Sequence, residues 1–316
     1  MDTNPAKVAD FDHTDPKLNP SEDVNILMEL AQPDNHDQGS SKNRQVDRNF
    51  ISYYGMHQNP FPDAVNPAFF YQTDHHAETL RRMKLAIEHD VSLAMVTGPS
   101  GTGKTLITQI LLQQLNAERF DPILVLVSPG LSKTGMLREI LSELNIPFPE
   151  GVHRTQEMLK LLSNHIIDLY NEGRKLVLFI DECHFLSSAN LHLIRTISNI
   201  EIPERKLTTC LLFGESKFSQ RLKHPSYESL RNRMFFHSVL PPLSPEECAQ
   251  YVKFRLMVAG RLHPLFTEDG FLALHALTDG VSRSVNKLGM MCLLEGHGQQ
   301  LTEIDGHLVQ QCATLL

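Results

Sequence analysis

Short, uniformly apolar segments alternate with amphipathic segments through most of the chain. The apolar segments have the length of strands and lie at 91–97, 123–128, 176–181, 208–213 and 235–240. The segments between them carry apolar residues at helical spacing and lie at 77–88, 104–116, 133–144, 155–171 and 189–200. Apolar strands separated by helices are typical of a parallel sheet that helices cover on both faces. The pattern therefore predicts an α/β fold.

The two ends of the chain differ from this central pattern. Beyond Pro245 apolar residues recur only at helical spacing, which predicts helices at 245–259, 267–277, 283–296 and 302–314 and no further strand. The first 48 residues are rich in Asp, Asn, Pro and Ser, and they hold too few apolar side chains to offset the entropy cost of ordering. We therefore expect a disordered acidic tail at 1–48, an α/β core at 49–240 and a helical domain at 241–316.

Most of the net charge of −8 lies in that tail. Residues 1–48 contain ten acidic and five basic side chains, a net charge of −5, which leaves −3 for the rest of the chain. This sign disfavours a protein that binds nucleic acid over its whole surface. The tail also holds one apolar island, Val24 to Ala31 behind an N-cap candidate at Ser21. A docking helix and a chance cluster of apolar residues both stay open as explanations of the island.

The composition indicates a chain without membrane anchor, disulfides or structural metal. No apolar run approaches the roughly 18 residues that a membrane span needs, and the N-terminus lacks a basic stretch followed by an apolar one. The five cysteines are odd in number, scattered and without a CxxC pair. The 16 histidines show no spacing typical of metal ligands. We therefore expect a location in the reducing cytoplasm.

A phosphate-binding motif follows the first predicted strand. Residues 98–105 read GPSGTGKT and fit the pattern GxxxxGK[ST] in the context of strand, loop and helix. Glycines let backbone N–H groups turn inward around phosphate oxygens, and the loop leads to a helix N-terminus, whose dipole favours anions. In this motif the lysine reaches the β- and γ-phosphates and the threonine hydroxyl binds Mg²⁺. The predicted nucleotide-binding residues of the loop are Gly98, Pro99, Ser100, Gly101, Thr102, Gly103, Lys104 and Thr105.

A second motif agrees with the first. The apolar run from Leu176 to Ile180 ends in two adjacent acids, Asp181 and Glu182, which is the Walker B arrangement. We expect Asp181 to bind the nucleotide together with the loop and to hold Mg²⁺ with Thr105, while Glu182 orients and polarises the attacking water. An acid that only stabilises a helix N-terminus is the alternative for Glu182. The two motifs together predict ATP as the substrate and Mg²⁺ as the cofactor.

The motifs and several further segments resemble the AAA+ ATPases of the ExeA type, the general secretion pathway protein A family, which are close to the TniB, TnsC and MuB transposition ATPases. Residues 54–61 (YGMHQNPF) and 66–71 (NPAFFY) resemble a segment that lies near the adenine in that family. Residues 242–244 and 251–260 resemble the family's turn into a helical lid and the first lid helix. The resemblance runs from about residue 53 to the C-terminus. It implies a P-loop NTPase core with a parallel sheet and a C-terminal helical lid.

The resemblance also implies two arginines that act on the γ-phosphate. Residues 280–286 (GVSRSVN) resemble the lid motif whose arginine, here Arg283, reaches the nucleotide of its own subunit. Residues 230–233 (LRNR) resemble the segment that presents an arginine finger to a neighbouring subunit, with Arg233 ahead of Arg231. A solvated helix face is the alternative for this segment. The predicted catalytic residues are therefore Glu182, Arg233 and Arg283.

Two segments depart from the family pattern. The Walker B motif continues as DECH, at residues 181–184, where the family usually has DEAQ. The region after the fourth strand reads FGES, at residues 213–216, where GQPE is common, so the sensor role in this region falls to Glu215 or Ser216.

Three biological uses of such an ATPase are compatible with the sequence. The first is a homo-oligomeric ATPase that couples hydrolysis to partner remodelling during assembly of a secretion, pilus or envelope system, whose membrane parts are other proteins. The second is a transposition regulator that forms ATP-dependent oligomers on duplex DNA, with Lys133 facing the DNA. The third is a scaffold that hydrolyses ATP slowly and whose interactions are switched by the bound nucleotide. The sequence predicts neither the partner nor the choice between ring and filament.

Overall fold

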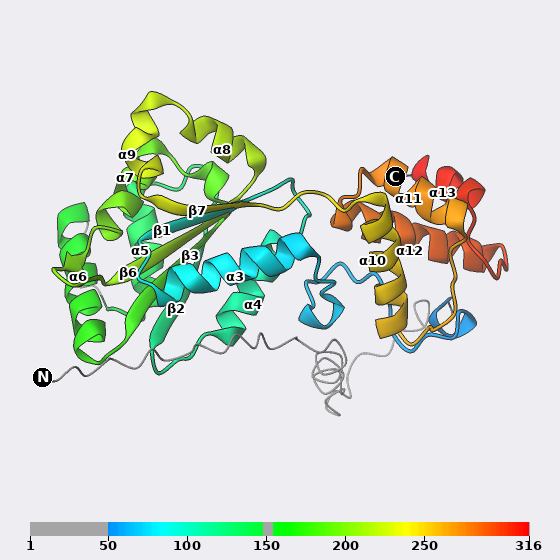
Figure 1. Ribbon diagram of the computed structural model, residues 1–316, viewed down its shortest axis with the longest axis horizontal. Helices are drawn as coiled ribbons and strands as arrows, with labels where there is room; N and C mark the ends of the chain where they lie inside the picture. Colours follow the sequence, from blue (N-terminus) through cyan, green and yellow to red (C-terminus); the bar gives the residue numbers. More distant parts are fainter. Residues whose placement is uncertain (1–49, 148–153, 316) are drawn as a thin grey trace, which may run out of the picture. The chain divides into compact units, whose positions relative to one another are not determined.

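A five-stranded parallel sheet lies at the centre of the first part of the described chain. The computed structural model describes residues 50–147 and 154–315, so the predicted disordered tail and its apolar island lie outside the described residues. The strand order is β2-β3-β6-β1-β7, and every neighbouring pair is parallel (Figure 1). The strands are β1 (Leu93–Thr97), β2 (Phe120–Leu126), β3 (Lys175–Asp181), β6 (Thr208–Gly214) and β7 (Met234–Val239).

Helices cover both faces of this sheet, and alternate residues of β3 show how. Leu176, Leu178 and Ile180 pack in one cluster with side chains from α5, α6, α7 and α8, whereas Val177 and Phe179 pack in another with α3 and α4. These helices are α3 (Asp74–Glu88), α4 (Lys104–Gln114), α5 (Lys133–Glu143), α6 (Thr155–Asn171), α7 (Ser188–Ile197) and α8 (Ser216–Leu222). The predicted α/β class with a covered parallel sheet is therefore confirmed.

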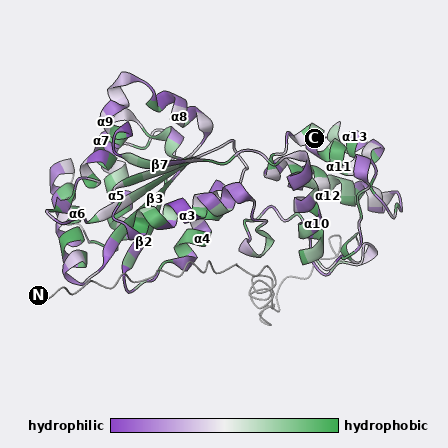
Figure 2. Ribbon diagram, in the orientation of Figure 1, coloured by the Kyte–Doolittle hydropathy of each residue, from purple (hydrophilic) through white to green (hydrophobic). Residues whose placement is uncertain are grey.

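Four helices follow the sheet and form a helical lid with an apolar cluster of its own. They are α10 (Pro245–Val258), α11 (Glu268–Thr278), α12 (Ser282–Gly298) and α13 (Gly306–Ala313). The turn into α10 is fixed by a capping box, in which Ser244 accepts from Glu247 N and the Glu247 carboxylate accepts from Ser244 N. Hydrophobic and hydrophilic residues alternate along these helices (Figure 2), as amphipathic helices around a shared core require.

The segment at the start of the described residues, 50–61, packs on the lid. The side chains of Phe50, Tyr54 and Phe61 belong to the lid cluster, although they precede β1 in the chain. A Cβ on Gly289 would lie 2.9 Å from the Phe61 ring, and a Cβ on Gly296 would lie 2.6 Å from the Tyr54 hydroxyl. Glycines on α12 therefore let these aromatic rings approach the helix, and residues 50–61 differ in their packing from the core at 49–240 to which the sequence assigned them.

Short elements account for most of the other differences from the sequence prediction. The two-residue strands β4 (Glu201–Ile202) and β5 (Arg205–Lys206), helix α9 (Glu228–Arg231) and α8 were not expected, because segments so short show no periodicity. The 3-10 turns η1 (Pro67–Phe69), η2 (Cys183–Phe185) and η3 (Pro225–Tyr227) were also not expected. Helix α3 begins three residues early because Thr73 accepts a hydrogen bond from His76 N. Among the described residues beyond Pro245, one isolated parallel bridge joins Phe266 and Ile304.

No helix within the ranges 50–147 and 154–315 combines the length and the apolar character that crossing a membrane requires.

Candidate active site

The phosphate loop connects the carboxyl end of β1 to the first residue of α4, and its glycines are needed for the path of the backbone. Gly101 and Gly103 have φ angles of 83° and 91°, in the left-handed region that favours glycine. A Cβ on Gly98 would lie 2.4 Å from Leu240 O, and one on Gly101 would lie 2.6 Å from Arg283 Cβ. The loop therefore fits between the end of β7 and the lid only with glycine at these positions.

Lys104 points back into the loop. Its side chain is buried, and Nζ donates to Gly98 O at 3.0 Å and to Pro99 O at 2.7 Å. Burial lowers the pKa of Lys104, while the carboxylates of Glu182, Asp181 and Glu215 act in the opposite direction. A buried ammonium group held by two carbonyls inside a loop of inward-facing backbone is suited to an anion that brings several oxygens.

The two predicted metal ligands meet beside the loop. Thr105 Oγ1, on the first turn of α4, donates to Asp181 Oδ2 at 2.9 Å, and Asp181 lies at the end of β3. Asp181 Oδ1 accepts from Glu182 N at 2.8 Å, which fixes the carboxylate. A hydroxyl and a carboxylate oxygen are hard ligands of the kind Mg²⁺ takes when phosphates and water supply the others. The donor set therefore fits Mg²⁺, although the described residues contain no cluster of three metal-ligating side chains of their own.

Glu182 follows Asp181 in an unusual backbone conformation. Its φ of 54° and ψ of 34° lie in the left-handed region, which costs a residue with a Cβ about 1 kcal/mol or more. The side chain is 40% exposed and lines the same cavity as Lys104 and Thr105. Its Oε2 lies 3.1 Å from Nδ1 of His184. The backbone strain thus occurs where a carboxylate faces the cavity beside the phosphate loop.

The structure brings Arg283 to the loop but not Arg233. Arg283 N donates to Gly101 O at 3.2 Å, and Nη1 donates to Ser100 Oγ at 3.2 Å, so the start of α12 contacts the phosphate loop. Arg233 precedes β7, whose Met234 pairs with Leu93 at the amino end of β1. The loop leaves the carboxyl end of β1, so about 15 Å of strand separates the two sites.

These residues open into a cavity of about 440 Å³ with two chemically different ends. The phosphate end comprises the loop from Ser100 to Thr105 with Glu182 and Arg283. The apolar end comprises residues 61–66 and 69–71 with side chains from the lid. A cavity of this size with one charged and one aromatic end fits a nucleotide. Of the segment expected near the adenine, residues from Phe61 onward line the cavity, whereas Tyr54 is buried in the lid cluster.

The apolar end contains a polar chain that sequence reasoning did not assign to the site. Arg255 Nη1 donates to Tyr251 OH at 2.6 Å, and Tyr251 OH donates to Asn286 Oδ1 at 2.7 Å. The Arg255 guanidinium is buried, lies 4.8 Å from the centroid of the Phe69 ring and donates from Nε to Pro60 O. Tyr251 and Arg255 are four residues apart on α10, so their helical spacing was the available signal for a shared face.

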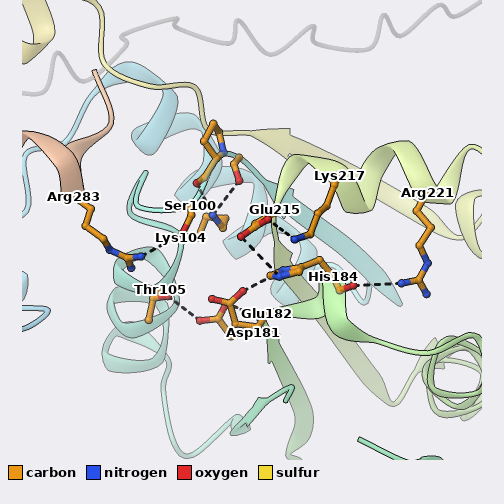
Figure 3. A network of polar contacts seen from close by, with 12 residues as sticks. Ser100, Lys104, Thr105, Asp181, Glu182, His184, Glu215, Lys217, Arg221 and Arg283 are labelled. Atoms are coloured by element: carbon orange, nitrogen blue, oxygen red, sulfur yellow. Dashed lines mark hydrogen bonds and ion pairs between the residues drawn. The ribbon is translucent and has the colours of Figure 1, made fainter. Parts of the chain in front are cut away.

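A second set of polar residues lies beside Glu182, and of these sequence reasoning singled out Glu215 but missed His184 and Lys217 (Figure 3). His184 lies between Glu182 and Glu215, with Nε2 3.8 Å from Glu215 Oε1. Lys217 Nζ lies 2.8 Å from Glu215 Oε2, and this hydrogen bond lowers the pKa of Glu215. The DECH sequence and the FGES region, which depart from the family pattern, thus meet in space. Of the two sensor candidates, Glu215 belongs to this set, and Ser216 begins α8.

Comparisons with known proteins agree with this geometry. Residues 87–222 match the family described as AAA domain. The chain is 30% identical over 237 residues to General secretion pathway protein A of Aeromonas hydrophila, and the match covers 75% of the chain. The same match covers 43% of that relative, so the chain spans less than half of its length.

Solved structures share the fold at low sequence identity. The ORC1 protein of Aeropyrum pernix, in complex with DNA, has a TM-score of 0.62 at 19% identity, covering 83% of this chain and 69% of that one. Cdc6p of Pyrobaculum aerophilum has a TM-score of 0.59 at 19% identity, with coverages of 80% and 68%. The RuvB branch migration motor of Thermotoga maritima has a TM-score of 0.52 at 19% identity, with coverages of 82% and 74%. The recognition made from the sequence is therefore confirmed: the chain carries the AAA domain of a P-loop NTPase and is related to general secretion pathway protein A.

Proposed function

We propose that this protein binds ATP with Mg²⁺ in the cavity and hydrolyses the β–γ phosphoric anhydride bond. The observation that carries the proposal is the convergence of three segments at one end of one cavity. Lys104, Thr105, Glu182 and Arg283 line this end, and Asp181 lies directly behind it as the partner of Thr105. These side chains supply two cations, the ligands for a metal ion and a general base around one phosphate position. Phosphoryl transfer requires groups of these kinds.

The residues divide the work of binding and hydrolysis between them. The N–H groups of the loop and the N-terminus of α4 bind the phosphates, and Lys104 exchanges its two carbonyl partners for phosphate oxygens. Thr105 and Asp181 would hold Mg²⁺, which neutralises charge that develops on the phosphoryl oxygens. Glu182 orients the attacking water and accepts its proton, and Arg283 stabilises the γ-phosphoryl group from the lid.

The site is completed by a second copy of the chain. Arg233 lies at the far end of β1 from the phosphate loop and therefore cannot reach the nucleotide of its own subunit. As an arginine finger it would act on the γ-phosphate of a neighbouring subunit in a homo-oligomer. Arg231 is less suited to this role, because its guanidinium donates to Leu222 O and His224 O and so ties α9 to the end of α8.

For the biological use, we infer an assembly ATPase of a secretion, pilus or envelope system that acts from the cytoplasm on a protein partner. The relationship to general secretion pathway protein A supports this use. All five cysteines are free and buried, which suits a reducing compartment. Duplex DNA is the alternative partner, with Lys133 at the start of α5 as the residue that faces it. The net charge of −3 beyond residue 48 disfavours DNA only slightly, because the tail carries most of the negative charge.

A gel shift on duplex DNA, with and without ATP and at two salt concentrations, separates these uses. An assembly ATPase leaves the duplex unshifted in both nucleotide states. An ATP-dependent shift that weakens steeply with salt would instead establish the DNA-binding alternative.

A further inference from the structure

His184 is buried between two carboxylates, only one of which faces the cavity. Its side chain is 3% exposed, with Nδ1 3.1 Å from Glu182 Oε2 and Nε2 3.8 Å from Glu215 Oε1. Both ring nitrogens therefore face acidic oxygens. Figure 3 shows the His184 ring with the Glu182 carboxylate on one side and the Glu215 carboxylate on the other.

The surroundings hold the His184 ring in place from several sides. The residue belongs to the turn η2, directly after β3, and Arg221 Nη1 donates to its carbonyl at 3.3 Å. The Phe185 ring lies 4.1 Å from the imidazole, between ring centroids. A Cβ on Gly214 would lie 2.5 Å from Cys183 Sγ and 3.2 Å from His184 N, so the end of β6 packs directly on this turn. The imidazole is thus a fixed group in the structure.

Glu182, by contrast, needs a partner to hold one orientation. Its side chain is 40% exposed and has three rotatable bonds, and its backbone is in the left-handed conformation. Solvated glutamate side chains sample several rotamers, whereas a general base must sit within hydrogen-bond distance of one water. His184 Nδ1 lies 3.1 Å from Oε2 but makes no hydrogen bond in the structure. A small rotation of the exposed Glu182 side chain would let an N–H at Nδ1 donate to Oε2, which would limit the rotamers and leave Oε1 for the water.

We propose that His184 is a positioning residue that holds the Glu182 carboxylate toward the attacking water, and that Glu215 aligns the imidazole from the other side, an arrangement that needs an N–H on each ring nitrogen. The inference rests on the proposed role of Glu182 as base. Lys217 completes the set, because its hydrogen bond keeps the Glu215 carboxylate ionised and in place. His184 is not among the residues that line the cavity, so it acts only through Glu182.

A double-mutant cycle on the full chain tests the proposal. ATP hydrolysis is measured for the wild type, Glu182→Gln, His184→Ala and the double variant, with KM, the Kd for ATP and the melting temperature of each. His184→Ala should lower kcat about 10- to 100-fold with KM and Kd unchanged, because a misplaced catalytic group costs that much while the phosphate loop is intact. In the Glu182→Gln background the same change should cost less than about 2-fold, since the group that it positions is already lost.

His184→Gln provides the matched variant. Its amide N–H can donate to Glu182 Oε2, so kcat should recover to within about 5-fold of the wild type. Glu215→Gln keeps the shape of its side chain and covers the case in which His184→Ala does not fold. It should lower kcat about 3- to 10-fold, again only when Glu182 is present.

The outcomes separate the inference from the function on which it rests. If Glu182→Gln hydrolyses ATP at the wild-type rate, the proposed base is wrong. If Glu182→Gln is slow but His184→Ala and Glu215→Gln keep the wild-type kcat, His184 does not position Glu182. Equal losses from His184→Ala in both backgrounds, or a loss that His184→Gln does not reverse, would likewise overturn the inference and assign His184 a structural role.

Discussion

The two ends of the nucleotide cavity are built in different ways. Apart from Arg283 of the lid, the phosphate end consists of residues that directly follow β1 and β3, and their positions are set by backbone geometry and by contacts such as Thr105 to Asp181. The apolar end is assembled from segments far apart in the chain, for example Pro60 and Arg255, which are 195 positions apart. We expect changes at the phosphate end to abolish binding or chemistry, and changes at the apolar end to weaken affinity alone.

The largest effect is expected from Lys104→Ala. This change removes the buried ammonium group that donates to two carbonyls of the phosphate loop. ATP affinity measured by calorimetry should fall by about 100-fold or more, because a charge-assisted contact to phosphate is lost inside a buried site. The exposed Lys84 on α3 is the matched control, and Lys84→Ala should bind ATP as the wild type does. Unchanged affinity in Lys104→Ala would show that the cavity does not bind through this loop.

The two arginines should give the next largest effect, on rate rather than on binding. Arg233→Ala and Arg283→Ala should each lower turnover by about 10³, the contribution typical of arginines that stabilise the transferred phosphoryl group. Because Arg283 contacts its own loop and Arg233 lies at the far end of β1, the variants should differ when mixed with Lys104→Ala protein. Hydrolysis should recover in the Arg233→Ala mixture and not in the Arg283→Ala mixture.

Specific activity that is constant down to concentrations where only monomer exists, without recovery in the Arg233→Ala mixture, would show that the site is complete within one chain.

Tyr251→Phe tests the apolar end and should have a smaller effect. It keeps the ring but removes the hydroxyl that joins Arg255 to Asn286. These two side chains are then no longer held in place in the wall of the cavity. The Kd for ATP should rise about tenfold while kcat at saturation stays unchanged, since the phosphate end is untouched. Tyr170→Phe, on the exposed side of α6, is the control. A fall in kcat with unchanged Kd would mean that the two ends do not act separately.

The smallest effect is expected from His76, which lies under the phosphate loop with Nε2 3.3 Å from Thr102 O. Burial lowers the pKa of His76 below 6.5, so the folded state favours the neutral ring. The unfolded chain then binds the proton more tightly, and the free energy of unfolding should decrease as the pH falls below about 6.5. His76→Asn should reduce this decrease in melts between pH 7.5 and 5.5. An identical pH dependence in both proteins would contradict the assignment.

The same contrast explains which features could be predicted from the sequence alone. Except for Arg283, the residues of the phosphate end follow one another in GPSGTGKT and DE, so a motif contains both their identity and their spacing. The three central strands β1, β3 and β6 were found because each is buried on both faces and is therefore almost uniformly apolar. The edge strands β2 and β7 are partly exposed, and their apolar residues still sufficed to predict them. Such patterns involve residues close together in the chain, so they can be recognised in a single sequence.

The remaining features depend on contacts between distant residues. His184 and Glu215 come together because β3 and β6 are neighbours in the sheet. The residues of the two strands do not indicate which strands will be neighbours. Tyr251, Arg255 and Asn286 look like ordinary residues of amphipathic helices until the lid places them at the cavity. Helices α8 and α9 were missed because seven and four residues are too few to show a period.

The central claim is that the cavity hydrolyses ATP with Glu182 as the base, and phosphate release at saturating ATP tests it most directly. The measurement compares the wild type with Glu182→Gln at equal nucleotide occupancy, which the Kd of each protein fixes. We predict that Glu182→Gln keeps its affinity for ATP and loses turnover by about 10² or more, because the amide accepts no proton from water. Equal rates of phosphate release in the two proteins would contradict the account.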